Sequence, residues 1–217
     1  MKYLHEFMSL AKGSERIERK FIMSQGQSSN ATSILLGLGF YEKYVPRSVN
    51  SIYFDDIYHS CLRDNIDGVP SRDKLRVRYY DYAFDKAKIE IKHRRNNIGF
   101  KSTFPLNLDI KSEKDALNAA KKWCSSNVLN VIFPSAYVRY KRRYFERDIF
   151  RATIDTFVNS GRVSGNHVLT SAMFNYEVIE FKYPTNLDSE FRVIYKYLDR
   201  IALRNTKSSK YSNALMY

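Results

Sequence analysis

Basic side chains alternate with apolar ones along residues 74–95, a pattern that predicts two β-strands joined by a loop near residues 83–84. On the first strand, one face carries Lys74, Arg76 and Arg78. On the second strand, the same face carries Glu90 and Lys92. Antiparallel pairing around the expected loop would set Glu90 near Arg78 and Lys92 near Arg76. The segment therefore predicts a patch of fixed cations with one carboxylate near its centre.

A patch of this kind suits phosphate, because arginine offers a planar fork of donors and lysine a point charge. An ordinary half-exposed hairpin also has one polar face, so this hairpin alone does not decide between the two interpretations. The same alternation recurs on most of the other expected strands, which favours a shared binding surface. One face of those strands carries Arg16, Glu18 and Lys20; Lys101; Arg139; Arg151 and Asp155; and Glu180 and Lys182.

The overall charge points to a polyanionic partner. Lysine and arginine number 36 and aspartate and glutamate 23, which gives a formal net charge of +13. Nucleic acid, a phosphorylated metabolite, a chain of inorganic phosphate and an acidic membrane surface all fit that sign. With 217 residues and 44% hydrophobic content, the chain is long enough for one domain with a sizeable core.

Cysteine content and hydropathy favour a soluble cytoplasmic protein. Cys61 and Cys124 are the two cysteines and have no metal-ligand spacing around them, so we expect two free thiols in a reducing compartment. The amino terminus lacks the apolar region of a signal peptide, and the longest apolar run, 34–40, is too short to span a bilayer.

The expected elements are those of an α+β fold with about eight strands. Residues 1–14 form a lead-in segment, and residues 56–73 a connector. Strands are expected at 15–23 and 49–55, as a pair within 74–95, at 99–106, as a pair in the ribbon 135–159 that turns at 146–148, near 167–173, and at 176–183. Helices are expected at 30–38, 112–127 and 188–203. Ser112 followed by Asp115 resembles a capping box, and residues 204–217 form a tail.

A sheet of this size tends to curl or close, and it can do so in two ways. Apolar faces turned inward would make a conventional barrel core with a basic exterior. Charged faces turned inward would make a polar tunnel, whose apolar outside the three helices would cover. The second closure explains the amphipathic helices, and we favour it. So many like charges cannot be buried without partners, so we expect the lumen to hold water, a metal ion and a polyanion.

The scattered carboxylates predict a divalent cation beside the phosphate. Mg²⁺ and Mn²⁺ prefer oxygen ligands and bridge phosphate oxygens. Asp155 and Glu90 also have a simpler interpretation as salt-bridge partners inside the barrel. Lys141 and Arg143 are expected to face solvent, and the four histidines form no constellation.

Eight ordered segments resemble one known family, the VTC domain of the polyphosphate polymerase in the vacuolar transporter chaperone, within the triphosphate tunnel metalloenzymes. They are RIERKF (16–21), NSIYFD (50–55), KLRVRYY (74–80), IEIK (89–92), YVRYKRRYF (137–145), FRATIDT (150–156), VIEFKYP (178–184) and KSSKY (207–211). The resemblance runs from about residue 15 to residue 211. It implies one tunnel domain over 1–217, an antiparallel barrel enclosing a basic tunnel, a divalent metal, and synthesis of polyphosphate from ATP.

The resemblance also implies roles for individual residues, which are carried over from the family position by position. The phosphate-binding group would be Lys20, Arg76, Arg78, Lys92, Lys101, Arg139 and Arg151. Glu180 would bind Mg²⁺ or Mn²⁺, with Lys182 beside it. One end of the tunnel would be closed by Lys207, Ser209 and Lys210 in the tail. The wider superfamily often begins with ExExK; Arg16 replaces the first glutamate here, while Glu18 is retained as a second candidate metal ligand.

Three functions from different classes follow. The first is a polymerase that transfers the γ-phosphate of ATP to polyphosphate; a membrane protein is a possible partner, because sensing or translocation would need other chains. The second is a hydrolase of triphosphate or polyphosphate in the same tunnel. The third is a non-catalytic module for RNA or DNA, since aromatic and basic residues interleave over 137–145. The third gives Glu18, Glu90 and Glu180 no role, so nucleic acid is not the expected partner.

Overall fold

A computed structural model describes residues 16–95, 98–106, 109–128, 132–165, 167–168, 172–206 and 209–216. Its centre is an eleven-stranded sheet, with pairs that are antiparallel throughout. The main path of the sheet runs β11-β1-β10-β7-β6-β2-β3-β4-β5, and β8 and β9 pair with β7. The predicted α+β class is confirmed.

The elements have the following bounds. The strands are β1 (Arg16–Ser24), β2 (Tyr41–Asp55), β3 (Ser71–Tyr80), β4 (Lys88–Arg95), β5 (Ile98–Pro105), β6 (Phe133–Arg147), β7 (Phe150–Ser164), β8 (His167–Val168), β9 (Ala172–Met173), β10 (Tyr176–Pro184) and β11 (Arg204–Asn205). The α-helices are α1 (Ser28–Gly37), α2 (Ser60–Ile66), α3 (Glu113–Asn127), α4 (Asp188–Leu198) and α5 (Lys210–Met216). Short 3₁₀ turns occupy Phe84–Lys86, Thr185–Leu187 and Asp199–Ile201.

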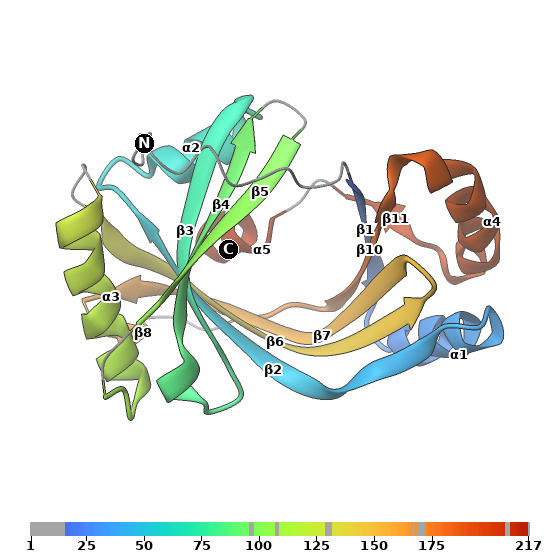
Figure 1. Cartoon of the computed structure of the whole chain (residues 1–217), viewed down its shortest axis with the longest axis horizontal. Coiled ribbons are helices and arrows are strands. Elements are labelled where there is room, and N and C mark those ends of the chain that lie inside the picture. Colours follow the sequence, from blue (N-terminus) through green and yellow to red (C-terminus); the bar gives the residue numbers. More distant parts are fainter. Residues whose placement is uncertain are drawn as a thin grey trace.

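The sheet curls strongly into a trough. In Figure 1, β3, β4 and β5 rise as one wall, β6 and β7 form the floor, and β1, β10 and β11 form the opposite wall. Within the described residues, β5 and β11 remain the two ends of the hydrogen-bonded path. The curvature agrees with the sequence-based expectation, but closure into a barrel is not confirmed.

Charged side chains line the inside of the trough, and the main apolar core lies outside it. One apolar cluster packs the outer face of β1, β7 and β10 under α1 and α4, with Phe21, Phe181 and Phe191 at its centre. A second packs the outer face of β3 and β4 under α3, through Leu75, Ile89 and neighbouring residues. The apolar clusters under the outer helices and the ion pairs between the strands show that, of the two closures considered, the structure adopts the curvature with charged faces inward.

One end of the trough is apolar on its inner face, and α5 fills it. Tyr211, Ala214 and Leu215 of α5 pack with inward residues of β2, β6 and β7, including Val138 and Val158. The Tyr211 hydroxyl also donates a hydrogen bond to the buried carboxylate of Asp55. Figure 1 shows α5 lying between the two walls. The tail 204–217, predicted without a helix, therefore places a helix inside the curved sheet.

Several local predictions need correction. The hairpin register differs by two residues, because Arg76 pairs with Glu90 and Arg78 with Lys88. The observed pairs centre the connection at residue 83, one residue before the centre implied by the predicted pairs, and a 3₁₀ turn at Phe84–Lys86 lies within the connection. Helix α1 begins at Ser28 rather than at 30, because Glu177 accepts hydrogen bonds from the Ser28 backbone and hydroxyl groups. The expected connector 56–73 contains α2 and the start of β3.

Other local predictions are confirmed. The Ser112 side chain caps α3 by accepting a hydrogen bond from the Asp115 backbone N–H. Cys61 and Cys124 are both buried free thiols. Among the helices that the structure describes, none has the length and apolar character needed to cross a bilayer.

Candidate functional site

The wall formed by β1 and β10 carries two carboxylates that share two lysines. Register pairs Lys20 with Glu180 and Glu18 with Lys182, so acids and bases alternate on the inner face. The Lys20 Nζ lies 2.8 Å from Glu18 and 3.6 Å from Glu180. The Lys182 Nζ lies 2.9 Å from Glu180 and 3.7 Å from Glu18. The four side chains form a compact square of alternating charge.

The lysines keep both carboxylates ionised. Burial raises the pKa of Glu18, but Lys20, Lys92 and Lys182 outweigh burial and lower that pKa to about 2. Burial also opposes ionisation of Glu180, and Lys20, Lys182 and Arg142 hold its pKa well below the usual range. Both groups are therefore anionic oxygen donors at neutral pH.

The opposite wall gathers three cations around one carboxylate. Arg76 donates to Glu90 Oε2 through Nε and Nη2, at 2.9 and 2.7 Å, and its Nη1 donates to the Tyr53 hydroxyl at 3.0 Å. Lys101 donates to Glu90 Oε1 at 2.7 Å, and Arg78 lies 3.4 Å from the same carboxylate. Burial raises the pKa of Glu90, and these cations lower it to about 2. One carboxylate thus holds three cations in fixed positions.

The floor of the trough adds a third ion cluster, which includes α5. Asp155 on β7 is 1% exposed and accepts two hydrogen bonds from Arg142 of β6, at 2.6 and 2.8 Å. Lys210, the first residue of α5, donates to the same carboxylate at 2.6 Å and lies 4.6 Å from the centre of the Tyr140 ring. Asp155 is therefore a salt-bridge partner of Arg142 and Lys210, as its simpler interpretation predicted.

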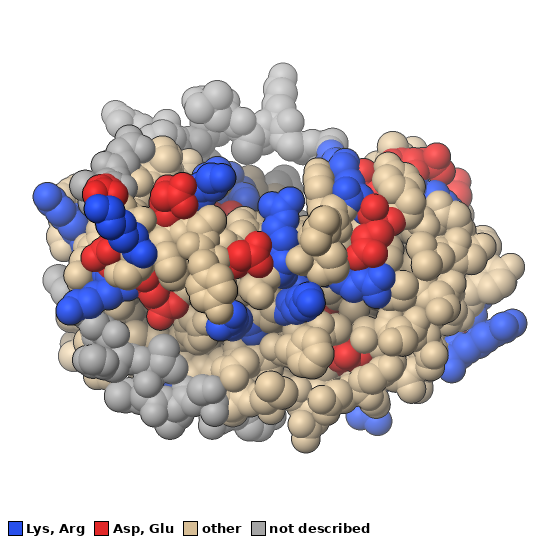
Figure 2. Space-filling view, turned by 90° about the horizontal axis from the view of Figure 1, so that it is seen from below, with Lys and Arg blue, Asp and Glu red and all other residues tan. Residues whose placement is uncertain are grey.

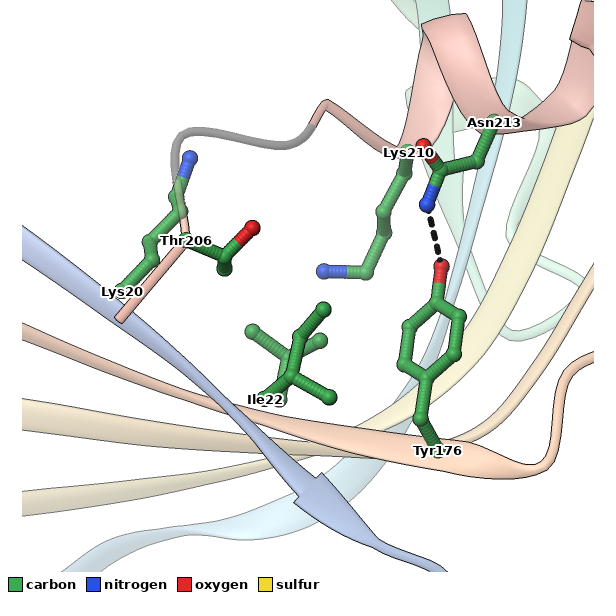
Figure 3. A pocket seen from close by; sticks show the side chains of 7 residues that line it. Lys20, Ile22, Tyr176, Thr206, Lys210 and Asn213 are labelled. Atoms are coloured by element: carbon green, nitrogen blue, oxygen red, sulfur yellow. Dashed lines mark hydrogen bonds between the residues drawn. The ribbon is translucent and has the colours of Figure 1, made fainter. Parts of the chain in front are cut away.

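The two walls approach each other across the trough. Lys92 of β4 lies 3.5 Å from Glu18 of β1, although these strands are far apart along the sheet. Beside the β1 wall is a small cavity lined by Lys20, Ile22, Tyr176, Val178, Thr206, Lys210 and Asn213. Figure 3 shows Lys20 on one side of this cavity and Lys210 reaching in from α5 on the other. Two segments far apart in the sequence thus each contribute a lysine to the lining of one cavity.

Two carboxylates are a donor set that fits Mg²⁺ or Mn²⁺ only in part. Among the described residues, no cluster of three or more His, Cys, Asp or Glu side chains is arranged to hold a metal. Mg²⁺ is commonly bound by one or two carboxylates and completed by water and substrate phosphates. Glu18 and Glu180 share both lysines and fit that pattern. A metal here would need phosphate to complete its ligands.

Most of the site residues expected from the sequence come together. The inner face brings together Glu18, Lys20, Arg76, Arg78, Lys92, Lys101, Glu180, Lys182 and Lys210. Arg151 pairs in register with Lys182, is 56% exposed and lies 3.3 Å from Glu146. Ser209 accepts a hydrogen bond from Lys74 at 3.1 Å. Lys207 lies outside the described residues.

Arg139 does not join them. It alternates with the inward Tyr140 and lies on the outer face, with its guanidinium 5.9 Å from the centre of the Tyr82 ring. Arg142, which was not selected from the sequence, occupies the inner face of the same strand. Both faces of β6 carry cations over residues 139–143, so alternation alone gave no means of choosing between them. The bidentate pair with Asp155 is what identifies the inward arginine.

The outside of the molecule differs from the inner face of the trough in how its charges are arranged. Figure 2 shows one outer face, where Lys and Arg side chains are interspersed with Asp and Glu. Proteins that bind nucleic acid usually carry a basic patch or stripe on one face. The mixed signs on this face contrast with the cation-rich interior of the trough.

Comparisons with known proteins agree with this geometry. The family model described as "VTC domain" matches residues 1–217. The fold is similar to that of a candidate adenylate cyclase from Vibrio parahaemolyticus (TM-score 0.58, 12% identity, covering 95% of this chain and 100% of that one). It is similar to the PH1012 protein from Pyrococcus horikoshii OT3 (TM-score 0.54, 14% identity, 92% and 99% covered).

A third solved structure adds a stated activity for a protein of this fold. The candidate adenylyl cyclase HpAC1 from Hippeastrum, described as revealing a dominant triphosphatase activity, has a TM-score of 0.51, with 13% identity and 91% and 94% of the two chains covered. No curated protein sequence matches this chain.

Proposed function

Because the chain belongs to the VTC domain family, within the triphosphate tunnel metalloenzymes, we propose that it is a metal-dependent polyphosphate polymerase. Family membership and the solved relatives indicate an enzyme that acts on triphosphates. The proposed reaction transfers the γ-phosphate of ATP to inorganic phosphate or to a growing polyphosphate chain. ADP is the leaving product.

One observation carries the proposal: two ionised carboxylates share two lysines inside a trough lined by further cations. Glu90 on the opposite wall and Asp155 on the floor are single carboxylates among cations, whereas Glu18 and Glu180 lie together on one wall and share both lysines. Cations lie on both walls and on the floor. A linear triphosphate between those walls would meet cations on several sides, with the carboxylate pair at one of them.

The residues of the chain have distinct proposed roles. Arg76, Arg78, Lys92 and Lys101 on one wall, Lys20 and Lys182 on the other, and Arg151 at the rim bind phosphate oxygens and stabilise charge in the transition state. Glu180 and Glu18 would hold Mg²⁺ or Mn²⁺, which would neutralise and orient the triphosphate. Tunnel enzymes of this kind generally depend on a divalent metal.

The bond changes need no nucleophile from the protein. An oxygen of the acceptor phosphate forms a bond to the γ-phosphorus, and the bond from that phosphorus to the bridging β–γ oxygen breaks. The displaced electron pair stays on ADP. Such a transfer depends on positioning and charge stabilisation, and the cations on both walls are suited to supply these.

Hydrolysis is the second candidate function. The Hippeastrum protein of the same fold is described as having a dominant triphosphatase activity. In the same trough, water in place of the acceptor phosphate would release phosphate instead of extending a chain. The difference between the two reactions is the acceptor, and the same phosphate-binding residues serve both.

Incubation with ATP and Mn²⁺, with and without a chelator, tests the proposal. A polymerase yields long polyphosphate and releases one ADP for each phosphate that it adds to the chain. The chelator should stop the formation of both products. Release of free phosphate without polymer would support the hydrolase. Absence of ATP consumption under all metal conditions would contradict the polymerase, and absence of tripolyphosphate cleavage as well would contradict the hydrolase.

A further inference from the structure

Lys74 is a cation of the inner face to which the family resemblance assigns no role. It lies two residues before Arg76 on β3 and pairs in register with Lys92 of β4. Lys92 in turn pairs with Lys101 of β5. Three lysines therefore lie side by side across three strands, an arrangement that like-charge repulsion makes unfavourable.

The neighbouring lysines of this row have carboxylate partners and Lys74 does not. Lys92 lies 3.5 Å from Glu18, and Lys101 lies 2.7 Å from Glu90. Within the described ranges, no carboxylate comes within ion-pair distance of the Lys74 ammonium. The charge of Lys74 is thus left uncompensated by the part of the protein that the structure describes.

Neutral oxygens hold the Lys74 ammonium in a fixed position. It donates to Asn65 Oδ1 of α2 and, at 3.1 Å, to Ser209 Oγ just before α5. Asn65 also donates to Ser212 of α5, so the two helices support each other around the lysine. An ammonium has three protons, and these contacts use two of them.

We infer that Lys74 is a phosphate-binding residue, which takes up one phosphate group of a bound triphosphate or polyphosphate beside Lys92. The inference rests on the proposed function and adds a ligand contact to it. The third ammonium proton and the missing carboxylate are the features that a phosphate oxygen would satisfy. Asn65 and Ser209 act as positioning residues for that contact.

The electrostatic surroundings support this role. Burial together with Lys92, Lys20 and Arg72 lowers the pKa of Lys74 to about 7, and Cys61 of α2 opposes this slightly. A phosphate anion beside the ammonium would raise that pKa again. Near pH 7, binding would then be accompanied by uptake of part of a proton at this residue.

Calorimetric titration with inorganic tripolyphosphate and Mg²⁺ at pH 7, in buffers of different ionisation enthalpy, measures both affinity and proton uptake. We expect Lys74→Met to weaken binding about tenfold, as loss of one charge-assisted contact does. Lys74→Arg keeps a permanent charge, so its affinity for tripolyphosphate should lie closer to that of the wild-type protein than the affinity of Lys74→Met does. Its proton uptake on binding should be smaller than that of the wild-type protein. Lys196→Met removes the same charge from an exposed position on α4 and serves as the control.

The outcomes separate this inference from the proposed function. If the wild-type protein binds tripolyphosphate and Lys74→Met binds it equally well with the same melting temperature, the role of Lys74 is overturned and the function stands. If the wild-type protein binds neither tripolyphosphate nor ATP, both fall. A parallel titration with ATP locates the contact: a loss for tripolyphosphate alone assigns Lys74 to the polymer, and a loss for both assigns it to the shared triphosphate.

Discussion

Glu180 is the more buried carboxylate of the pair, with 9% of its side chain exposed against 30% for Glu18. It lies within ion-pair distance of Lys20 and Lys182, and it faces Arg142 from the floor. Glu18 remains beside both lysines when Glu180 is replaced, so the wall keeps one anion. The fold should therefore tolerate loss of the charge better than the proposed metal site does.

We expect Glu180→Gln to abolish metal-dependent consumption of ATP while leaving the circular dichroism spectrum unchanged. The amide keeps the shape of the side chain and loses the anionic oxygen that a divalent cation prefers. Glu190→Gln on the outer helix α4 is the matched control and should retain full activity. Unchanged turnover in Glu180→Gln would remove this residue from the metal site.

Glu90 gives a prediction about stability and pH. Its folded-state pKa of about 2 lies below the usual value of 4.5, so its contribution to stability is present above pH 4.5 and is lost as the pH falls toward 2. The wild-type free energy of unfolding should lose about 1–2 kcal/mol from this group between pH 7 and pH 3. Glu90→Gln lacks the ionisable group, so its unfolding free energy should decline less over that range in chemical denaturation. Parallel declines in the two proteins would contradict the ion cluster.

At the scale of elements, the helices outside the sheet supply the core that the charged interior cannot. Phe191 of α4 stacks on Tyr183 with ring centres 4.7 Å apart and lies 5.2 Å from Phe181. We expect Phe191→Ala to lower the free energy of unfolding by about 3–5 kcal/mol, because it leaves a large cavity. Val193→Ala, on the exposed side of the same helix, should change it by less than about 0.5 kcal/mol. Equal losses of unfolding free energy in the two variants, measured by urea denaturation, would contradict the packing of α4 through Phe191.

The sequence predicted those elements in which one face is apolar and the other charged. Alternation assigned the inner faces of β1, β3, β4, β5 and β10 correctly, because most of the cations of each strand share one parity and apolar residues dominate the other. It failed on β6, where cations occupy both faces and Arg139 and Arg142 cannot be told apart by spacing. The short helices α2 and α5 were missed because seven residues are too few to show helical periodicity.

Contacts distant in sequence were also beyond prediction. The Lys92–Glu18 contact joins β4 to β1, and the Lys210–Asp155 pair joins the tail to β7. Such pairs depend on how far the sheet curls and on where α5 packs, and neither is encoded in the spacing of one strand. The family resemblance, by contrast, supplied the order of the segments and most of the inward residues.

At the scale of the whole molecule, the curved sheet sorts the charge of the chain into two environments. The formal net charge is +13, and cations on both walls and the floor face a common space, while the outer face in Figure 2 carries charges of both signs. A trough lined in this way raises the local concentration of a polyanion. The central claim is therefore that phosphate binds inside the trough and not on the outer surface.

Two arginines on opposite faces of the sheet test that claim directly. Arg76 lies on the inner face of β3, and Arg139 lies on the outer face of β6. The measurement is the affinity for Mg²⁺-tripolyphosphate of Arg76→Gln and Arg139→Gln, with melting temperatures recorded for both. We expect Arg76→Gln to weaken binding at least about tenfold and Arg139→Gln to leave it within about twofold of wild type. Equal losses in the two variants, or a loss confined to Arg139→Gln, would contradict binding inside the trough.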